Sequence, residues 1–247
     1  MAPIGSTNIT APPPLRGELD TCPVCGNSQF ARQPILWEKL IREWELSPAE
    51  ADYIDLQQGL SCTSCRNNLR SMTLAAAICR AFACTVPLDS ACRHDATLRT
   101  LTVLEINRAG GLTPTLRLLP GHQLREFPEF DMQDMKCASD SVDVIVHSDT
   151  LEHVPDSRAA LCECLRVLKP GGHLFYTVPI VAGRLTRTRM GLSPSYHGNI
   201  ESEHEDLRVQ REYGADFWCE LLQAGFNNLT LTTMIFPASI VVSAVKS

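Results

Sequence analysis

The chain has 247 residues, of which 44% are hydrophobic and 20% are charged, and its formal net charge at pH 7 is -6. This length and balance suit one main globular domain with an appendage. The negative charge argues against a dedicated nucleic-acid surface, which usually carries a basic excess. No apolar run reaches the roughly 18 residues that a membrane span requires, so no membrane partner is expected.

The amino-terminal residues 1–18 are rich in Pro, Ser and Thr, which predicts a flexible leader. They lack the charged and apolar regions of a secretory signal, so we expect a cytoplasmic protein. The chain has 11 cysteines. Without a signal, these thiols are expected to serve as metal ligands or core residues rather than to form disulfides.

Two C-x-x-C pairs form the clearest metal-binding pattern. Two thiolates across a tight turn can reach a common zinc at about 2.3 Å, and two such turns complete a closed, tetrahedral, structural site. The alternative is two unrelated cysteine pairs, but neither is followed by the β-α-β pattern that a thioredoxin motif requires. The predicted zinc ligands are Cys22, Cys25, Cys62 and Cys65.

Helical patterns fill the segment between the two pairs. Ser47-Pro48-Ala49-Glu50 predicts a capping box at the start of one helix. Residues 67–83 predict another helix, linking a zinc-binding helical module at 19–95 to the rest of the chain. An apolar stripe between the pairs packs on the zinc site or, alternatively, forms a wall facing a substrate. Its members are Trp37, Leu40, Ile41 and Trp44.

Strand and helix patterns alternate through residues 96–247. Strands are predicted at 101–106, 122–127, 142–146 and 173–178, with helices at 112–119 and 159–168. Short connections between such elements predict a doubly wound, mostly parallel α/β sheet. A helix opening at 213–216 and a hairpin of strands at 229–236 and 239–245 would complete this core.

The stretch from Asp131 to Pro179 carries several motifs in a fixed order. They are Asp131, Asp140-Ser141-Val142-Asp143, Leu151-Glu152-His153-Val154 and Leu165-Arg166-Val167-Leu168-Lys169-Pro170-Gly171-Gly172. In order and spacing they resemble the core of class I S-adenosylmethionine-dependent methyltransferases of the type 11 kind. The resemblance implies a Rossmann-like sheet. Glu105 and Asp131 lie too close in sequence for all the elements that the family places between them, so we expect a sheet trimmed by one helix and one strand.

The resemblance also implies the cofactor contacts. Glu105 stands at the acidic position of the family's D-x-G-x-G-x-G turn, where Asn107 and Ala109 replace two glycines, and asparagine tolerates left-handed backbone. Glu126 would accept hydrogen bonds from the ribose hydroxyls, or, alternatively, is a surface carboxylate. The residues expected to bind S-adenosylmethionine are Glu105, Asn107, Gly110, Gly111, Glu126, Asp131, Met132 and His147.

The polar turn at 147–150 ends a strand where the resemblance places the methyl group. His153, nearby, could be a general base or a structural residue. Residues 180–212 lose periodicity, which predicts a lid or binding loop. Its arginines could receive an anionic substrate, or could be ordinary solvated charges. The candidate catalytic residues are Asp149, His153, Tyr196 and His197.

The expected function is therefore methyl transfer from S-adenosylmethionine to a small molecule, sugar or secondary metabolite, including an anionic one. One alternative is a non-catalytic binding protein on the same fold, because the glycine turn is incomplete. Another is a ribosomal RNA methyltransferase, because some of these enzymes also carry an amino-terminal zinc module. The acidic net charge argues against the last alternative.

Overall fold

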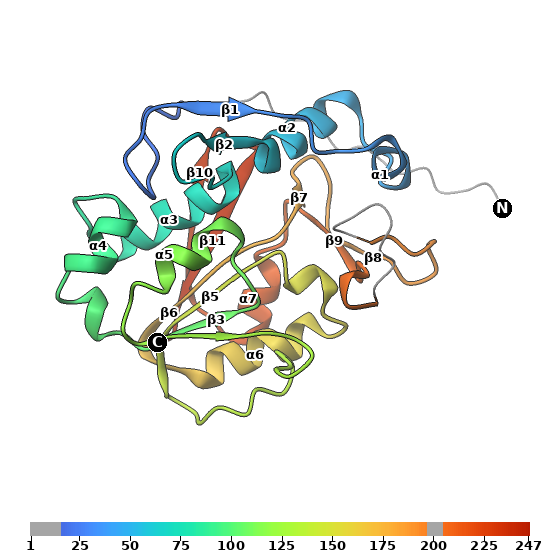
Figure 1. The fold of residues 1–247 in the computed structure, drawn as a ribbon. Coiled ribbons are helices and arrows are strands. Elements are labelled where there is room, and N and C mark those ends of the chain that lie inside the picture. Colours follow the sequence, from blue (N-terminus) through green and yellow to red (C-terminus); the bar gives the residue numbers. More distant parts are fainter. Residues whose placement is uncertain (1–15, 197–204) are drawn as a thin grey trace.

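The computed structural model describes residues 16–196 and 205–247. An amino-terminal module lies along one side of an α/β core, and α6 lies along the opposite side (Figure 1). Within the described ranges, no helix is both long enough and apolar enough to cross a membrane.

The amino-terminal module consists of a two-stranded antiparallel ribbon and four helices. The capping box predicted at Ser47 is confirmed: its hydroxyl accepts from the Glu50 N–H, and the Glu50 carboxylate accepts from the Ser47 N–H. The elements are β1 (Phe30–Arg32), α1 (Glu38–Glu43), α2 (Pro48–Gly59), β2 (Leu60–Cys62), α3 (Leu69–Ala81) and α4 (Leu88–His94).

The core is a six-stranded sheet in the order β10-β11-β6-β5-β3-β4. Its last four strands run parallel, and β11 and β10 form an antiparallel hairpin at one edge, so the predicted mostly parallel sheet is confirmed. The strands are β3 (Val103–Ile106), β4 (His122–Arg125), β5 (Val142–Ser148), β6 (Leu168–Thr177), β10 (Asn228–Met234) and β11 (Ser239–Val245).

The predicted trimming of the sheet is confirmed as well. The helix after β3 is shorter than predicted, reduced to η2 (Gly110–Leu112) and α5 (Thr113–Leu116), where Pro114 lies in the first turn and Pro120 follows the end. The described segment between β4 and β5 contains neither a helix nor a strand. The carboxyl edge of the parallel sheet is therefore less covered by the core's own helices than the family pattern implies.

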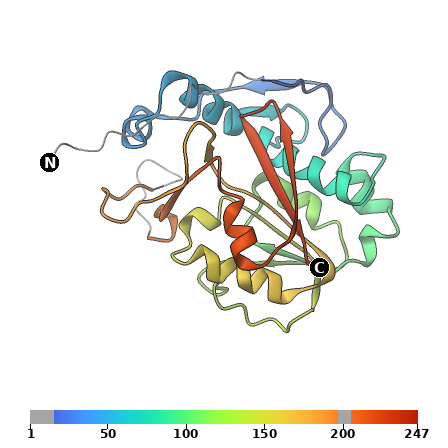
Figure 2. The same ribbon diagram turned by 180° about the vertical axis from the view of Figure 1, so that it is seen from behind.

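Helices cover both faces of the sheet (Figure 2). On one face, α3 packs against β11, β10 and β6, and module side chains such as Leu74 join Val144 and Phe175 in one hydrophobic cluster. On the other face, α6 (Ser157–Val167) and α7 (Cys219–Ala224) pack against side chains such as Ile145 and Leu174. Because the module and the sheet share a hydrophobic cluster, the module cannot move without disturbing the core.

The segment after β6 is more ordered than the loop predicted for it. Three short strands, β7 (Ile180–Val181), β8 (Arg187–Thr188) and β9 (Arg211–Gly214), form a small sheet in the order β7-β9-β8. The last helix therefore begins at Cys219 and not within 213–216. Gly214 is required in β9, because a Cβ there would lie 2.2 Å from the Arg184 carbonyl oxygen. The remaining short turns of helix are η1 (Leu98–Thr100), η3 (Leu151–His153) and η4 (Glu205–Leu207).

Candidate functional site

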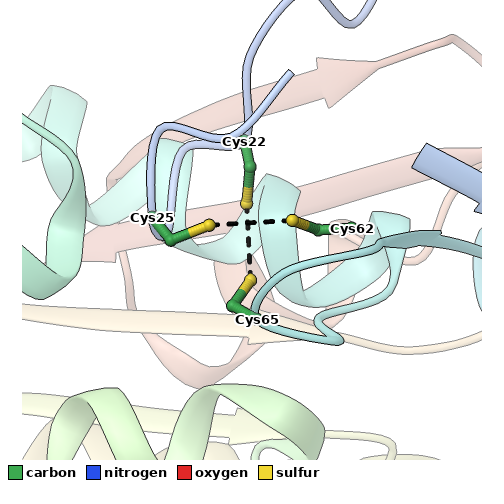
Figure 3. Close-up of side chains that lie close together, drawn as sticks. All are labelled: Cys22, Cys25, Cys62 and Cys65. Atoms are coloured by element: carbon green, nitrogen blue, oxygen red, sulfur yellow. Dashed lines mark hydrogen bonds between the residues drawn. The ribbon is translucent and has the colours of Figure 1, made fainter. Parts of the chain in front are cut away.

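The four cysteines of the two C-x-x-C pairs converge on one point between the turn at 22–27, before β1, and the turn at 62–67, at the end of β2 (Figure 3). The Sγ–Sγ distances are 3.6 Å for Cys22–Cys65 and 3.6 Å for Cys25–Cys62. All four sulfur atoms lie within 4.8 Å of one another. Tetrahedral zinc with Zn–S bonds of about 2.3 Å places its sulfurs about 3.8 Å apart, so this donor set fits a closed zinc site.

The two cysteine turns have the same backbone hydrogen bonds. In the first turn, Cys22 N–H donates to the Asn27 carbonyl and Gly26 N–H donates to the Cys22 carbonyl. In the second turn, Cys62 N–H donates to the Asn67 carbonyl and Arg66 N–H donates to the Cys62 carbonyl. Both Gly26 and Arg66 have positive φ. Burial acts to raise the pKa of the Cys62 thiol, but backbone N–H groups and the Asn27 amide outweigh it and lower that pKa to about 7. Burial raises the pKa of the Cys22 and Cys25 thiols, so in the absence of metal the thiolate is favoured at Cys62 and not in the first turn.

Asp149 lies at the carboxyl end of β5 and is held by the amino-terminal module. It forms an ion pair with Arg70 of α3, and it accepts a hydrogen bond of 3.2 Å from Gln58 of α2. Asn68 in turn donates to Gln58 over 3.0 Å. No sequence motif marked Arg70 or Gln58 as a partner of this carboxylate. Two module helices thus fix the orientation of a carboxylate on the core.

His153 lies in η3, one short turn beyond Asp149. Its Nδ1 is 3.1 Å from the Arg208 carbonyl oxygen, which can only accept, so Nδ1 carries a proton. The neutral ring therefore has its lone pair on Nε2. The carboxylate of Glu152, 1% exposed, lies 3.7 Å from Nε2 and would stabilise the imidazolium that forms when Nε2 takes up a proton.

A cavity of about 370 Å³ opens beside Asp149 and His153. Pro179 lines it after β6, so it lies at the carboxyl ends of two parallel strands. Most of its wall comes from the amino-terminal module. The lining residues are Ile35, Leu36, Trp37, Leu40, Trp44, Leu46, Ile54, Gln57, Gln58, Arg70, Asp149, His153, Pro179 and Leu207.

The turn after β3 is organised by Glu105, which is fully buried. Its carboxylate accepts from the Ala109 N–H at 2.8 Å and the Thr113 hydroxyl at 2.5 Å, and lies 2.6 Å from His122 Nε2. Asn107 adopts the left-handed conformation, with a φ of 53°. Glu105 therefore shapes the turn, and its contact with a cofactor stays a prediction.

Gly110 and Gly111 lie beneath the start of α3. A Cβ on Gly111 would lie 2.9 Å from Asn67 Oδ1, and one on Gly110 would lie 3.2 Å from Ser71 Oγ. The Asn67 amide also donates to Cys65 Sγ over 3.4 Å. One asparagine thus connects the cysteine cluster to the glycine turn.

The other residues expected to bind cofactor have different environments. Glu126 pairs with Arg108 at 3.0 Å on the surface, and Asp131 accepts from the Gln133 N–H at 2.8 Å. Met132 is buried in the hydrophobic cluster beneath α6. His147 is fully buried and stacks on Tyr176 with ring centroids 4.7 Å apart. Burial lowers the pKa of His147 to about 3, so its ring is neutral near pH 7.

Three arginines of the predicted lid are already paired with carboxylates. Arg184 donates to both oxygens of Glu50 at 2.8 Å, while Arg187 and Arg189 both bind Glu212. A substrate anion would have to displace these pairs. Tyr196 forms a backbone bridge with Arg208, and His197 lies outside the described residues.

Replacing Arg184 with methionine should lower the free energy of unfolding by about 3 kcal/mol, because it leaves the buried Glu50 carboxylate unpaired. Arg184 also donates to the carbonyls of Trp44 and Glu45, which lie at the end of α1. Burial acts to raise the pKa of Glu50, but the hydrogen bonds from Arg184 and Ser47 outweigh it and lower that pKa. The stabilisation is therefore fully present above the ordinary glutamate pKa of about 4.3, and it is lost as the pH falls through the lower pKa of Glu50 in the folded protein.

Urea unfolding at pH 7 and at lower pH measures this effect. The matched control is Arg42→Met, which removes an exposed pair with Glu38 on α1 and should change the free energy by less than about 0.5 kcal/mol. Equal losses of unfolding free energy in Arg184→Met and Arg42→Met would contradict the assignment. So would a loss in Arg184→Met that stays the same at pH values below the glutamate pKa.

Comparison with known proteins relates this core to one enzyme family. Residues 94–176 match the methyltransferase domain family. The sequence matches no curated protein. Similar solved structures include an S-adenosylmethionine-dependent methyltransferase, possible histamine N-methyltransferase, from Thermotoga maritima, with 13% identity, a TM-score of 0.40, and coverage of 72% of this chain and 90% of that one.

Two archaeal structures give comparable values. A chain from the complex of the Haloferax volcanii Trm112 methyltransferase activator with a methyltransferase has 14% identity and a TM-score of 0.39, covering 70% of this chain and 96% of that one. An S-adenosylmethionine-dependent methyltransferase from Methanosarcina mazei has 14% identity and a TM-score of 0.36, and the match covers 58% of this chain and 91% of that one.

Proposed function

We propose that this chain, which carries a methyltransferase domain at residues 94–176, transfers a methyl group from S-adenosylmethionine to a small molecule. The observation that carries the proposal is the place of the cavity. It lies at the carboxyl ends of β5 and β6, beside Asp149 and His153. Ligands of open α/β sheets bind outside the carboxyl ends of the strands, near the point where strand order reverses, which here lies between β3 and β5, so the cavity borders that point at β5.

The turn after β3 is suited to the cofactor. Asn107 and Gly110 both have positive φ, at 53° and 57°, and such backbone can bring N–H groups close to a ligand. Glu126, with 44% of its side chain exposed, would accept hydrogen bonds from the ribose hydroxyls in place of Arg108, and Asp131 lies where the family contacts adenine. When bound, S-adenosylmethionine supplies an electrophilic methyl group.

His153 and Asp149 would act on the methyl acceptor. The lone pair of His153 Nε2 would take the proton of an acceptor hydroxyl or amine, and Glu152 would stabilise the resulting imidazolium. Asp149, held by Arg70 and Gln58, would orient the acceptor through a hydrogen bond. Methyl transfer depends mainly on alignment of the reacting atoms, so few catalytic residues are needed.

The cysteine cluster would hold a structural zinc. Four thiolates complete the tetrahedron and leave no open position for water or substrate. The zinc would fix the two cysteine turns and so position β2 and α3. Through Asn67 it would also hold the glycine turn in place.

A second candidate is a non-catalytic binding or accessory protein built on the same fold. It is favoured by the Arg108–Glu126 pair, because Arg108 occupies the carboxylate that the ribose would need. Both side chains are well exposed, however, so the pair is worth little and a ligand could replace it.

Calorimetric titration with S-adenosylmethionine tests the proposal. We expect saturable binding, weakened about tenfold or more by Glu126→Ala, because hydrogen bonds to a charged group are lost. Arg108→Ala is the matched control, and it should bind at least as tightly as the original protein because it frees Glu126. No heat with S-adenosylmethionine or S-adenosylhomocysteine at millimolar ligand would overturn the proposal. Binding without release of S-adenosylhomocysteine for any acceptor would favour the second candidate.

A further inference from the structure

The amino-terminal module makes most of the cavity wall at the carboxyl edge of the sheet. Trp37, Leu40 and Trp44 come from α1 and its flanks, and Ile54 comes from α2. We infer that this cavity is the methyl-acceptor site, that the module is the part of the chain that recognises the acceptor, and that the acceptor is a neutral, ring-containing, largely apolar molecule with one hydroxyl or amine. The inference rests on the proposed function.

The lining has an apolar part and a polar part. The module supplies most of the apolar lining, whereas Gln58, Arg70 and Asp149 form one polar group where the module meets the core, and His153 and Gln57 also line the cavity. Ligand sites of a few hundred Å3 commonly combine an apolar wall with a few polar groups that fix orientation. Such a cavity would bind the apolar body of the acceptor within the module and hold its nucleophile beside Asp149 and His153.

The charges around the cavity favour a neutral acceptor. The guanidinium of Arg70 and the carboxylate of Asp149 neutralise each other in an ion pair. The lid arginines that could have bound an anion are paired with Glu50 and Glu212. A sugar would leave most of its hydroxyls without partners against the tryptophan wall, which costs free energy for each buried group.

The module wall is held in place by contacts within the module and with the rest of the chain. The Trp44 indole donates to Ser195 Oγ over 3.1 Å, and the backbone N–H groups of Ile35 and Leu36 donate to Asp55 at 2.5 and 2.9 Å. A rigid apolar wall selects its ligand by shape. Trp37 is half-buried and lines the cavity, so its side chain can be removed at less cost to folding than the buried Trp44.

The reaction in this site is a balanced displacement. The lone pair of the acceptor oxygen or nitrogen forms a bond to the methyl carbon, and the carbon–sulfur bond breaks with its electron pair going to sulfur. The acceptor proton passes to His153 Nε2. The products are the methylated acceptor and S-adenosylhomocysteine.

Calorimetry with three probes tests the acceptor class: 2-naphthol, which is neutral, 2-naphthoate, which is anionic, and methyl glucoside, which is polyhydroxylated. We expect saturable binding of 2-naphthol and at least about tenfold weaker binding of the other two. Tighter binding of 2-naphthoate or methyl glucoside would overturn the inference.

Two tryptophan substitutions locate the binding. Trp37→Ala should weaken 2-naphthol binding about tenfold or more, because it removes a large apolar contact. The matched control, Trp218→Ala, changes an exposed residue beside α7 and should have no effect. Should Trp37→Ala not fold, Ile35→Glu places a carboxylate in the same wall and should weaken binding as strongly. Equal binding by the wall variants and the control would overturn the inference.

Titration of S-adenosylmethionine into the same proteins separates this inference from the proposed function. Cofactor binding without 2-naphthol binding would overturn the acceptor class and leave the methyltransferase intact. Binding of 2-naphthol without any cofactor binding would overturn the assignment of the cavity ligand as a methyl acceptor.

Discussion

Replacing Cys22 with serine should abolish zinc binding and lower the free energy of unfolding by about 5 kcal/mol or more, because structural zinc supplies a large part of the folding free energy of small metal-bound modules. Cys22 is buried and its sulfur lies 3.6 Å from that of Cys65. The module shares a hydrophobic cluster with the core sheet, so the loss should spread to the whole chain. The melting temperature should fall by about 10–20 °C for a chain of this size.

Native mass spectrometry and thermal unfolding measure this prediction. The original protein should carry one zinc per chain, and Cys22→Ser should carry none. Cys162→Ser is the matched control, since Cys162 is exposed on α6 and should be almost neutral to stability. Purified protein without zinc, or equal melting temperatures for the two variants, would rule out a structural zinc at this cluster.

Replacing His153 with glutamine should reduce turnover about 100- to 1,000-fold, which is the usual contribution of a general base. Glutamine can still donate to the Arg208 carbonyl that now lies 3.1 Å from Nδ1, but it cannot take up the acceptor proton. S-adenosylmethionine affinity should be unchanged, because His153 lies at the acceptor cavity and not at the glycine turn. Release of S-adenosylhomocysteine with 2-naphthol as acceptor provides the rate.

The matched control for this effect is His94→Gln, at the exposed end of α4. It should leave both turnover and cofactor affinity unchanged. Turnover in His153→Gln within about twofold of this control would exclude His153 as the base. Weaker cofactor binding in His153→Gln alone would point to a role in shaping the cofactor site.

Local patterns in the sequence predicted much of the fold. Alternating apolar runs and short connections indicated the parallel strands, and the close spacing of Glu105 and Asp131 indicated the missing helix and strand. The convergence of two cysteine pairs followed from their spacing. These features depend on residues that are near one another in the chain, or on a pattern that the methyltransferase family shares.

The parts that could not be predicted depend on distant pairs. The Glu50–Arg184 bond joins residues 134 positions apart, and nothing local distinguishes Arg184 from a free lid arginine. The sequence left open whether the aromatic stripe packs on the zinc site or faces a substrate, and Trp37, Leu40 and Trp44 line the cavity because α1 lies across the carboxyl edge of the sheet. Helix length after β3 was overestimated, because the leucine spacing continued past Pro114 to Leu119, whereas the helix ends at Leu116.

A crystal structure with S-adenosylhomocysteine tests the central claim most directly, namely that the glycine turn holds the cofactor and the tryptophan-lined cavity holds the acceptor. The account predicts the nucleoside between the turn at 107–111 and Asp131, with its sulfur directed into the cavity beside Asp149 and His153. A nucleoside bound within the cavity against Trp37 and Trp44 would contradict it.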